Sequence, residues 1–429
     1  MDRKISFISF WLGQTVSQLG SSMTAFALTI WVFEKTQTAM TVSFMSFCTW
    51  MPYILVSIFA GGMIDSHSKK AILIITHSVA AFCTISILIS IHRGVLEVRQ
   101  IYMVNAIAGF MNAFQSPASS VVTGFLIPKK QYARASGLLS FSGSLVMVAA
   151  PMLSGMFVAF AGLSVILFLD LLSFFIAMFS LLFIKIEEPA KQMKKNRKKQ
   201  QSDLQEGFEF LKREKGILYI MVSMAAINFF SRLTYENILS PMILSRSGGD
   251  AGVYGIVSGV MGFGGVAGGL LLVAGKKEKD PLKLIYFSAG FSFLIGDLMM
   301  GAGRNLWAWS AAGLAASLPI PFIMAGQNVI LYRMVPGKLQ GRVFAIRNGV
   351  QYSAIPVGIL LGGYLADHVF EPFMASGRKA AALLGKVVGT GSGSGMAVMF
   401  LCTGLLGTAV CFLGYKNHYI QSLKGEVSD

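Results

Sequence analysis

Charged side chains are scarce in this sequence. Only 13% of its 429 residues are Asp, Glu, Lys or Arg and 54% are hydrophobic, whereas about a quarter of an average soluble protein is charged. No polar stretch between the apolar runs is long enough to form a separate water-soluble domain. This composition excludes an ordinary soluble protein and is typical of a chain embedded in a membrane.

Cysteine is also rare, with four residues in the chain. Cys48, Cys83, Cys402 and Cys411 all lie in apolar runs, without a CxxC pair or a histidine cluster nearby. This pattern indicates neither a disulfide framework nor a zinc site. We expect these cysteines to fill the core, and we expect no bound metal.

Motifs for nucleotide chemistry and catalysis are missing as well. The glycines of 262–269 loosely fit a dinucleotide fingerprint, but no strand precedes them and they lie within an apolar run. The stretch "GLLLVAGKK" lacks the spacing of a phosphate-binding loop and its Ser or Thr. The five histidines are scattered, without an Asp and a nucleophile at catalytic spacing. The chain is therefore predicted to be no enzyme and to need no cofactor.

Long apolar runs are what the chain has instead. Twelve of them are long enough to cross about 30 Å of hydrocarbon as a helix. The first follows "MDRK" and continues without a small-residue cleavage site, which indicates a retained helix rather than a signal peptide. The sequence thus predicts an all-α membrane protein with twelve transmembrane helices. The expected spans are 7–33, 40–64, 71–91, 101–126, 134–160, 163–184, 217–244, 251–274, 282–302, 305–331, 342–366 and 395–415.

Basic residues outnumber acidic ones, 36 to 20, which gives a formal net charge of +16. When successive connections are assigned to alternate sides, 26 of the 36 Lys and Arg residues fall on the face that holds both termini, 8 on the other and 2 within spans. Cytoplasmic loops carry such an excess, so the charge indicates topology rather than nucleic-acid binding. Both termini are expected in the cytoplasm, with 185–216 as a solvated basic linker that contacts anionic lipids.

The sequence resembles itself at an offset of 208 residues, which indicates an internal duplication. We expect two pseudo-symmetric six-helix bundles, 1–184 and 217–429, joined by the linker. Residues superposed by this offset include Gly61 with Gly269, Phe114 with Phe322, Pro128 with Pro336, Arg134 with Arg342 and Gly155 with Gly363.

Two stretches carry a family resemblance. The connection after the second run reads "GGMIDSHSKK", which supplies Gly61, Asp65, Lys69 and Lys70, and residues 112–137 read "NAFQSPASSVVTGFLIPKKQYARASG". The first resembles the gate motif of the major facilitator superfamily. The second is similar to the macrolide-efflux branch of that superfamily in the spacing of Phe, Pro-Ala and the following Pro. The resemblance implies two parallel bundles with a substrate path between them.

The resemblance also implies a cytoplasmic gate. There the carboxylate of Asp65 is expected to meet the start of the eleventh helix near Arg342, where the cation and the helix dipole both favour an anion. Lys69 replaces an Arg that the family usually has, so a bidentate fork is missing. The arginine that many members carry in the fourth helix is also absent, because no Arg or Lys lies between Arg99 and Lys129. Proton coupling must therefore be organised differently.

Polar side chains follow one helical face in several spans. In the first span Gln14 and Gln18 recur with serines at helical spacing, and the seventh span repeats the pattern from Asn228 to Glu236. Lipid cannot satisfy such groups, and helices 1, 4, 7 and 10 line the central cavity in the resembled family. The alternative is that these groups only form hydrogen bonds between helices. The residues expected in the substrate cavity are Gln14, Gln18, Asn112, Asn228, Tyr235, Gln327 and Gln351.

Charged residues within the spans are the candidates for proton coupling. Arg232 and Glu236 lie one turn apart in "NFFSRLTYENILSP", and pairing reduces the cost of about 2.5–3.5 kcal/mol for a lone charge at a helix centre. We expect Glu236 to take up a proton and Arg232 to hold it ionised between cycles; a static ion pair is the alternative. Asp170 and Asp297 lie mid-helix, as further proton sites or as structural groups.

The connection 367–394 is unusually long, and its Gly and Ser end predicts flexibility. Its middle, "GRKAAALLGKVV", fits either a segment on the outer membrane surface or a disordered loop.

These patterns and the resemblance predict a monomeric secondary active transporter of the cell membrane. It is expected to exchange protons for a small lipophilic drug or antibiotic, with membrane lipids and no nucleic acid as further partners. The 33 Phe and 24 Met residues favour a substrate of this kind. Two alternatives stay open: an importer or exporter of a small metabolite or siderophore, and a transporter-like membrane sensor.

Overall fold

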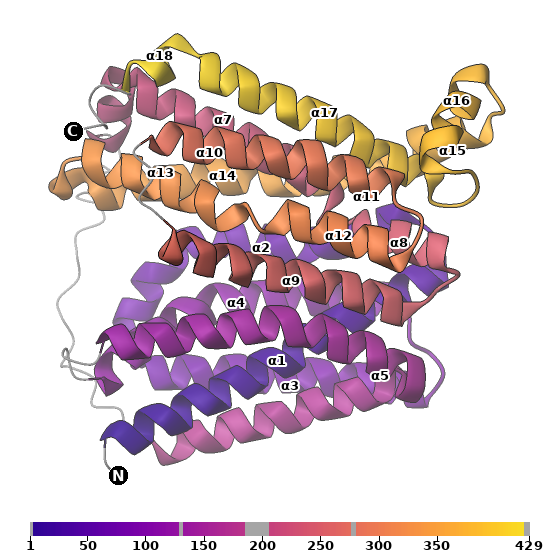
Figure 1. The fold of residues 1–429 in the computed structure, drawn as a ribbon. Helices are drawn as coiled ribbons and strands as arrows, with labels where there is room; N and C mark the ends of the chain where they lie inside the picture. Colours follow the sequence, from indigo (N-terminus) through magenta and orange to yellow (C-terminus); the bar gives the residue numbers. More distant parts are fainter. Residues whose placement is uncertain (1–2, 128–131, 185–205, 276–279, 424–429) are drawn as a thin grey trace. The chain divides into compact units, whose positions relative to one another are not determined.

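The computed structural model describes residues 3–127, 132–184, 206–275 and 280–423. Within these ranges the chain forms helices joined by short turns, without a strand (Figure 1). The predicted all-α fold class is confirmed. The helices are α1 (Arg3–Thr36), α2 (Ala39–Ser66), α3 (Lys69–His92), α4 (Val98–Leu126), α5 (Tyr132–Phe183), α7 (Lys215–Thr234), α8 (Leu239–Ser247), α9 (Ala251–Ala274), α10 (Pro281–Phe291), α11 (Leu298–Ala302), α12 (Leu306–Ser317), α13 (Ile320–Met334), α14 (Gly337–Leu365), α15 (Glu371–Ala375), α16 (Lys379–Val388), α17 (Ser394–Lys416) and α18 (His418–Gln421), with the π-helical turns η2 (Ser292–Asp297) and η3 (Ala366–Phe370).

Ten helical segments of the described part are long and apolar enough to cross a membrane. One of them lies in α5, which has 52 residues and would extend about 78 Å as a straight helix, more than twice the hydrocarbon thickness. The backbone leaves the helical region at Gly162, where φ is 76° and ψ is 175°. Helix α5 is therefore two crossings, residues 132–161 and 163–183, close to the two spans that the sequence predicts.

Helix α4 is not among those ten segments, although its 29 residues are long enough to cross. Its polar side chains lower its hydropathy, and the structure satisfies that of Asn105 internally. Thr49 of α2 donates a hydrogen bond of 2.9 Å to the amide oxygen of Asn105, whose nitrogen donates to the carbonyl of Ile101. A Cβ at Gly109 would collide with the Thr49 carbonyl, so only glycine allows this approach. Counting α4 and both crossings of α5 gives the predicted twelve.

Several predicted spans are interrupted rather than uniform. The seventh consists of α7 and α8 with a turn over 235–238 between them. Pro241 lies just inside α8 and has no N–H for the carbonyl four residues earlier, which accounts for the break. In the tenth span, α12 and α13 are separated at Pro319. The ninth span contains the π-helical turn η2, a feature frequently found at functional sites.

Contacts divide the chain into two compact units. Helix α2 begins in unit 2 and continues in unit 1, and α9 begins in unit 1 and continues in unit 2. The boundaries predicted from the sequence, 1–184, 185–216 and 217–429, stay a prediction. Unit 1 comprises residues 1–37, 44–194 and 249–259, and unit 2 comprises residues 38–43, 195–248 and 260–429.

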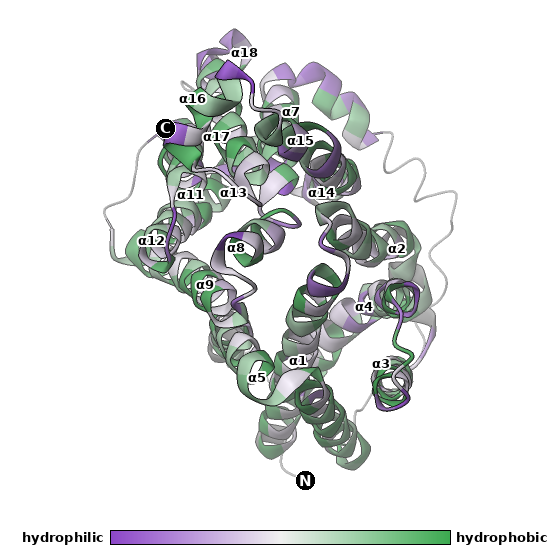
Figure 2. Cartoon of the chain, turned by 90° about the vertical axis from the view of Figure 1, so that its right-hand side faces the viewer, coloured by the Kyte–Doolittle hydropathy of each residue, from purple (hydrophilic) through white to green (hydrophobic). Residues whose placement is uncertain are grey.

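Lipid-facing surfaces account for much of the apolar composition. In Figure 2 hydrophobic colouring dominates the helical ribbons. Large apolar side chains stand almost fully exposed, with Phe160 at 88% and Val273 at 86%. Water would disfavour so many exposed apolar groups, whereas hydrocarbon accommodates them.

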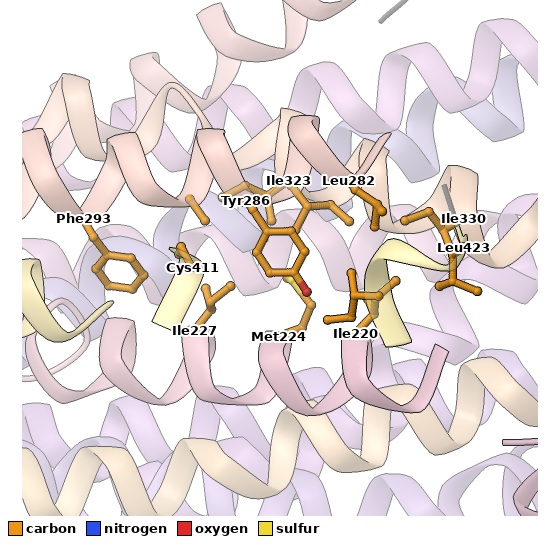
Figure 3. Packing of buried hydrophobic residues seen from close by; sticks show 13 residues of the cluster. Ile220, Met224, Ile227, Leu282, Tyr286, Phe293, Ile323, Ile330, Cys411 and Leu423 are labelled. Atoms are coloured by element: carbon orange, nitrogen blue, oxygen red, sulfur yellow. The ribbon is translucent and has the colours of Figure 1, made fainter. Parts of the chain in front are cut away.

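A buried tyrosine organises part of the core of unit 2 (Figure 3). The ring of Tyr286 in α10 lies among Met224, Ile227 and Ile323, which come from α7 and α13. Its hydroxyl bonds the Ser223 hydroxyl at 2.6 Å, so the polar end of the ring is satisfied within the bundle. Apolar packing and an internal hydrogen bond thus hold α7, α10 and α13 together.

The end of the predicted linker is part of the folded structure. Residues 206–213 form a helix whose Leu211 packs against Val343 and Ile346 of α14, and Glu206 forms an ion pair with Arg342. The solvated tether expected over 185–216 is therefore wrong for residues 206–213, because Leu211 finds an apolar surface to bury. Residues 185–205 lie outside the described part of the chain.

The long outer connection is helical rather than disordered. It forms η3, α15 and α16, and two arginines bind the last carbonyl groups of α16. Arg304 donates to the carbonyls of Lys386 and Val387 at 2.8 and 3.1 Å, and Arg246 donates to that of Val388. Cations at a helix C-terminus are favourable because they meet unsatisfied carbonyls and the negative end of the dipole. The disordered-loop alternative is therefore wrong for 379–388.

The start of α2 is held by residues of unit 2. Asp367 in η3 accepts hydrogen bonds from the backbone N–H groups of Ala39 and Met40, at 3.0 and 2.7 Å. One turn later, Ser43 accepts a bond of 2.5 Å from Asn237, which lies in the break of the seventh span. Asp367 thus supplies an N-terminal cap from a distant part of the chain.

Replacing Gly162 by Ala should lower the free energy of unfolding by about 1–3 kcal/mol, because its backbone conformation is almost restricted to glycine. No heavy atom lies within 4 Å of the added Cβ, so packing makes no contribution. Thermal unfolding of the purified protein in detergent measures the change. Gly143→Ala, in the same helix and equally open, is the matched control and should be neutral or stabilising. Equal melting temperatures for both variants would contradict the assignment of a strained turn.

Asp367→Ala should cost about 1–2 kcal/mol of stability, since it leaves two backbone donors of α2 without their acceptor. Asp367→Asn keeps an acceptor oxygen and should retain most of the wild-type stability. The same thermal unfolding assay measures both variants. If Asp367→Ala melts at the wild-type temperature, the cap does not hold α2.

Candidate functional site

The break between α7 and α8 places a turn inside a membrane span. The segment "NFFSRLTYENILSP" straddles this turn, so Glu236 lies in the turn rather than on a continuous helix as expected. Unwound backbone in the middle of a span is a common way to build a transport site, because it presents polar groups that a regular helix keeps internally bonded.

Arg232, in the last turn of α7, forms an ion pair with Glu236 in the turn between α7 and α8. Their side chains are 30% and 27% exposed, whereas Thr234 and Asn237 beside them are fully buried. The pair is thus the accessible part of an otherwise enclosed turn. The structure brings the two residues together as the spacing predicts, and their role in proton coupling stays a prediction.

Asp297 lies next to this turn, at the end of η2. Tyr235 donates a hydrogen bond of 2.9 Å to one carboxylate oxygen, and Thr403 of α17 donates one of 2.7 Å to the other. The Asp297 side chain is completely buried. The ring of Tyr235 also packs edge-on against Phe400, with centroids 5.2 Å apart. Asp297 therefore connects the broken helix to the ninth and twelfth spans.

Asp170 forms a similar cluster in unit 1. It lies in the second crossing of α5, and its carboxylate accepts hydrogen bonds from Thr24 at 2.9 Å and from Ser21 and Thr84 at 3.3 Å. Helices α1 and α3 supply these hydroxyl groups. Its side chain is only 2% exposed. Three helices thus meet at one carboxylate.

Each of the two clusters joins spans of its own half, and the spans joined are equivalent in the two halves. In each half, a buried aspartate ties together the first, third and sixth spans. In the first half the carboxylate comes from the sixth span and a threonine, Thr84, from the third; in the second half Asp297 comes from the third and Thr403 from the sixth. Both halves therefore have a carboxylate–threonine bond between their third and sixth spans, but the span that carries the carboxylate in one half carries the threonine in the other.

His77 is a buried polar residue to which the sequence analysis assigns no role. It lies in α3 with 1% exposure, and its ring nitrogens contact the Gln14 amide nitrogen at 3.1 Å and the Ser17 hydroxyl at 3.5 Å. Its ring also lies 6.2 Å from that of Phe174. The available signal was a lone histidine in the middle of an apolar run. Gln14, expected in the substrate cavity, thus points at α3.

The other residues expected in the substrate cavity differ in their surroundings. Gln18 and Asn112 are exposed, Asn228 is half-buried and Tyr235 is bound to Asp297. The side-chain nitrogens of Gln327 in α13 and Gln351 in α14 are buried, and within the described residues neither has a hydrogen-bond partner. The assignment of these seven residues to a substrate site stays a prediction.

Arg347 in α14 is held within unit 2. Its guanidinium donates to the side-chain oxygens of Asn328 and Asn348 at 3.0–3.1 Å and lies over the Phe344 ring, 5.0 Å from the centroid. These contacts join α13 to α14. Asn328 follows Gln327 in the sequence, and Arg347 lies one helical turn before Gln351.

The predicted gate residues are only partly described. Helix α2 continues to Ser66, two residues beyond the predicted span 40–64, so Gly61 lies within a helix. The side chain of Asp65 lies outside the described part of the chain. Lys70 donates to the carbonyls of Leu182 and Ile184 at the end of α5, at 3.1 and 2.8 Å. Lys69 lies beside Lys70 in the first turn of α3.

Among the described residues, no group of three His, Cys, Asp or Glu side chains lies close enough to hold a metal ion.

Known proteins resemble this chain over most of its length. The transmembrane secretion effector family matches residues 3–392. Macrolide efflux protein A of Streptococcus pyogenes is 25% identical over 370 residues, which cover 85% of this chain and 90% of that protein. Macrolide efflux protein A of Enterococcus faecalis is 24% identical over 319 residues, which cover 73% and 98%.

Solved transporter structures share the fold. A bacterial homologue of the human lysosomal transporter Spinster superposes with a TM-score of 0.69 at 13% identity, covering 96% of this chain and 97% of that chain. The nucleoside transporter NupG gives a TM-score of 0.69 at 11% identity, covering 96% and 99%. With this fold and the family match over 3–392, the chain belongs to the transmembrane secretion effector family of the major facilitator superfamily, and is a multi-pass secondary transporter rather than an enzyme.

Proposed function

We propose that this protein exports lipophilic drugs or antibiotics of the macrolide kind from the cell in exchange for protons. One structural observation carries the coupling part: an accessible ion pair, Arg232 with Glu236, lies at the break of the seventh span, directly beside the buried Asp297 cluster. The substrate class and direction come from the names of the Streptococcus and Enterococcus relatives. A monomer in the cell membrane with cytoplasmic termini completes the proposal.

Coupling would begin with protonation of Glu236. The added proton removes the negative charge of the carboxylate, so Arg232 loses its ionic partner within the membrane span, where an unpaired cation is costly. Tyr235 lies between Arg232 and Glu236 in the sequence, and its hydroxyl donates a hydrogen bond to Asp297. A movement of the turn would therefore be transmitted to η2 and α17 through this hydrogen bond.

The substrate would be selected mainly by apolar contact. Flexible Met and flat Phe side chains can repack around ligands of different shape. Gln327 and Gln351 supply two buried amide donors without a described partner. They suit the hydroxyl and carbonyl oxygens of a large, weakly polar ligand, since a buried donor without an acceptor costs about 1–3 kcal/mol.

The cytoplasmic gate would involve the start of α14. Arg342 is engaged there by Glu206. We propose that Asp65 approaches the same helix start during the cycle, with Gly61, Lys69 and Lys70 shaping that end of α2 and α3.

Export can be measured in cells that lack their own macrolide pumps. Cells that express the protein should accumulate less radiolabelled erythromycin and less ethidium than cells with an empty vector, and an uncoupler should abolish the difference. Because apolar selection is permissive, unlabelled erythromycin should compete with ethidium efflux. Equal accumulation of every compound in both strains would exclude the export proposal, and discrimination between analogues differing by one hydroxyl would exclude apolar selection.

Glu236→Gln keeps the size of the side chain and its hydrogen-bonding groups but removes its titration. Efflux of erythromycin driven by an imposed pH gradient in proteoliposomes should fall at least about tenfold, as expected when a coupling group is lost. Glu209→Gln, an exposed carboxylate on the 206–213 helix, is the control and should transport normally. Undiminished pH-driven efflux by Glu236→Gln, with an unchanged pH profile, would show that the ion pair is static.

A further inference from the structure

Ionisable residues are almost absent from the membrane spans of the first half. Among the Asp, Glu, His, Lys and Arg residues of its six predicted spans, only His77 and Asp170 lie away from a span end; Arg134 stands at the first position of 134–160. Such residues are costly within hydrocarbon and mark functional sites by default. Two in one half, without a cation between them in the spans, therefore require an explanation.

Both residues contact the same face of α1. Gln14 and Ser17 reach the His77 ring, and Ser21 and Thr24 reach the Asp170 carboxylate. These four α1 positions are separated by three, four and three residues, which is the spacing of one helical stripe. The histidine and the aspartate thus share one polar seam between α1, α3 and the second crossing of α5.

The seam is closed and tightly packed. His77 and Asp170 are 1% and 2% exposed. A Cβ at Gly20, on α1, would come within 2.9 Å of the Asp170 carboxylate, so glycine lets α1 lie directly against it. Away from the helix ends, the other titratable group on α1, α3 and the second crossing of α5 is the half-buried thiol of Cys83; Lys69, Lys70 and His92 lie at the ends of α3, and α1 has none between residues 5 and 33. The Phe174 ring faces His77 from α5.

We propose that His77 and Asp170 form a second proton-binding site, in unit 1, which takes up one proton from water in each transport cycle. The inference rests on the proposed function, since it assumes that protons drive transport. One proton leaves the seam neutral, either as a carboxylic acid with a neutral imidazole or as an imidazolium with a carboxylate. Release to water leaves one negative charge, which the hydroxyls of Ser21, Thr24 and Thr84 stabilise.

The protonation state would control how firmly α1 is held. An ionised carboxylate accepts from all three hydroxyls, and hydrogen bonds to a charged group are about twice as strong as neutral ones. Protonation weakens these bonds and turns one oxygen into a donor. Proton uptake would therefore loosen α1 from α3 and α5, and release would tighten it, which supplies unit 1 with its own coupled movement.

Infrared difference spectroscopy of the purified full-length protein in lipid nanodiscs tests the site without a substrate. A band of a protonated carboxyl group should appear as the pH is lowered, should be lost in Asp170→Asn, and should remain in Glu236→Gln. His77→Gln should shift the midpoint of that band by about one pH unit, because the seam loses its second proton acceptor. Ser180→Ala is the control: it removes a buried hydroxyl of the same crossing that donates to the Ala177 carbonyl of its own helix, and it should leave the band unchanged.

Two results would overturn the proposal: titrating carboxyl bands that are the same in Asp170→Asn as in the wild type, or a midpoint of the Asp170 band that His77→Gln leaves unchanged. If Asp170→Asn does not fold, Thr24→Val replaces it, and the midpoint must then rise because the ionised carboxylate loses a donor. The outcome is separable from that of the proposed function. An absent band with intact pH-driven erythromycin efflux refutes this site alone, whereas a titrating band without such efflux refutes the proposed transport reaction.

Discussion

Within hydrocarbon, a polar group can be satisfied only by another part of the protein, and the internal structure follows from this constraint. Several buried polar side chains tie their helix to a neighbour. Thr49 and Asn105 join α2 to α4, and Ser223 and Tyr286 join α7 to α10. Glycines act with these bonds, because close contact between backbones is what brings short hydroxyl groups within reach. Polar pairs and small residues together decide which helices touch, while apolar side chains fill the remaining space and face lipid.

The two aspartate clusters apply this constraint within each half. A carboxylate can accept several hydrogen bonds at once, so one residue can join three helices. Asp170 does so in unit 1 and Asp297 in unit 2, through equivalent spans but from different helices. Either the third or the sixth span can carry the carboxylate, because the hydrogen bond joins the two helices in both cases. The same groups are also the ones that a proton can switch, because protonation changes both their charge and their hydrogen bonding.

Several helices are interrupted within a span or depend at one end on distant residues. The turn before Pro241, the π-helical turn η2 and the start of α2 under Asp367 all leave backbone groups that depend on side chains or on distant residues for hydrogen bonds. Such positions are less costly to rearrange than the interior of a regular helix, whose hydrogen bonds form together. The turn before Pro241 is bonded to η2 through Tyr235 and Asp297 and to the start of α2 through Asn237 and Ser43, so these interruptions lie beside the Arg232–Glu236 pair.

The sequence by itself determined the class of the protein, the positions of the spans and the pairing of Arg232 with Glu236. These depend on hydrophobic length and on residues one helical turn apart, which are local properties. Tertiary structure alone decided that Gln14 meets His77, that Tyr235 and Thr403 meet at Asp297, and that Arg342 pairs with Glu206. The sequence predicts that a helix has a polar face, but it does not specify which distant helix that face will meet. That choice is made when spans far apart in the chain pack together, since only then do buried groups such as the Asp297 carboxylate find their partners.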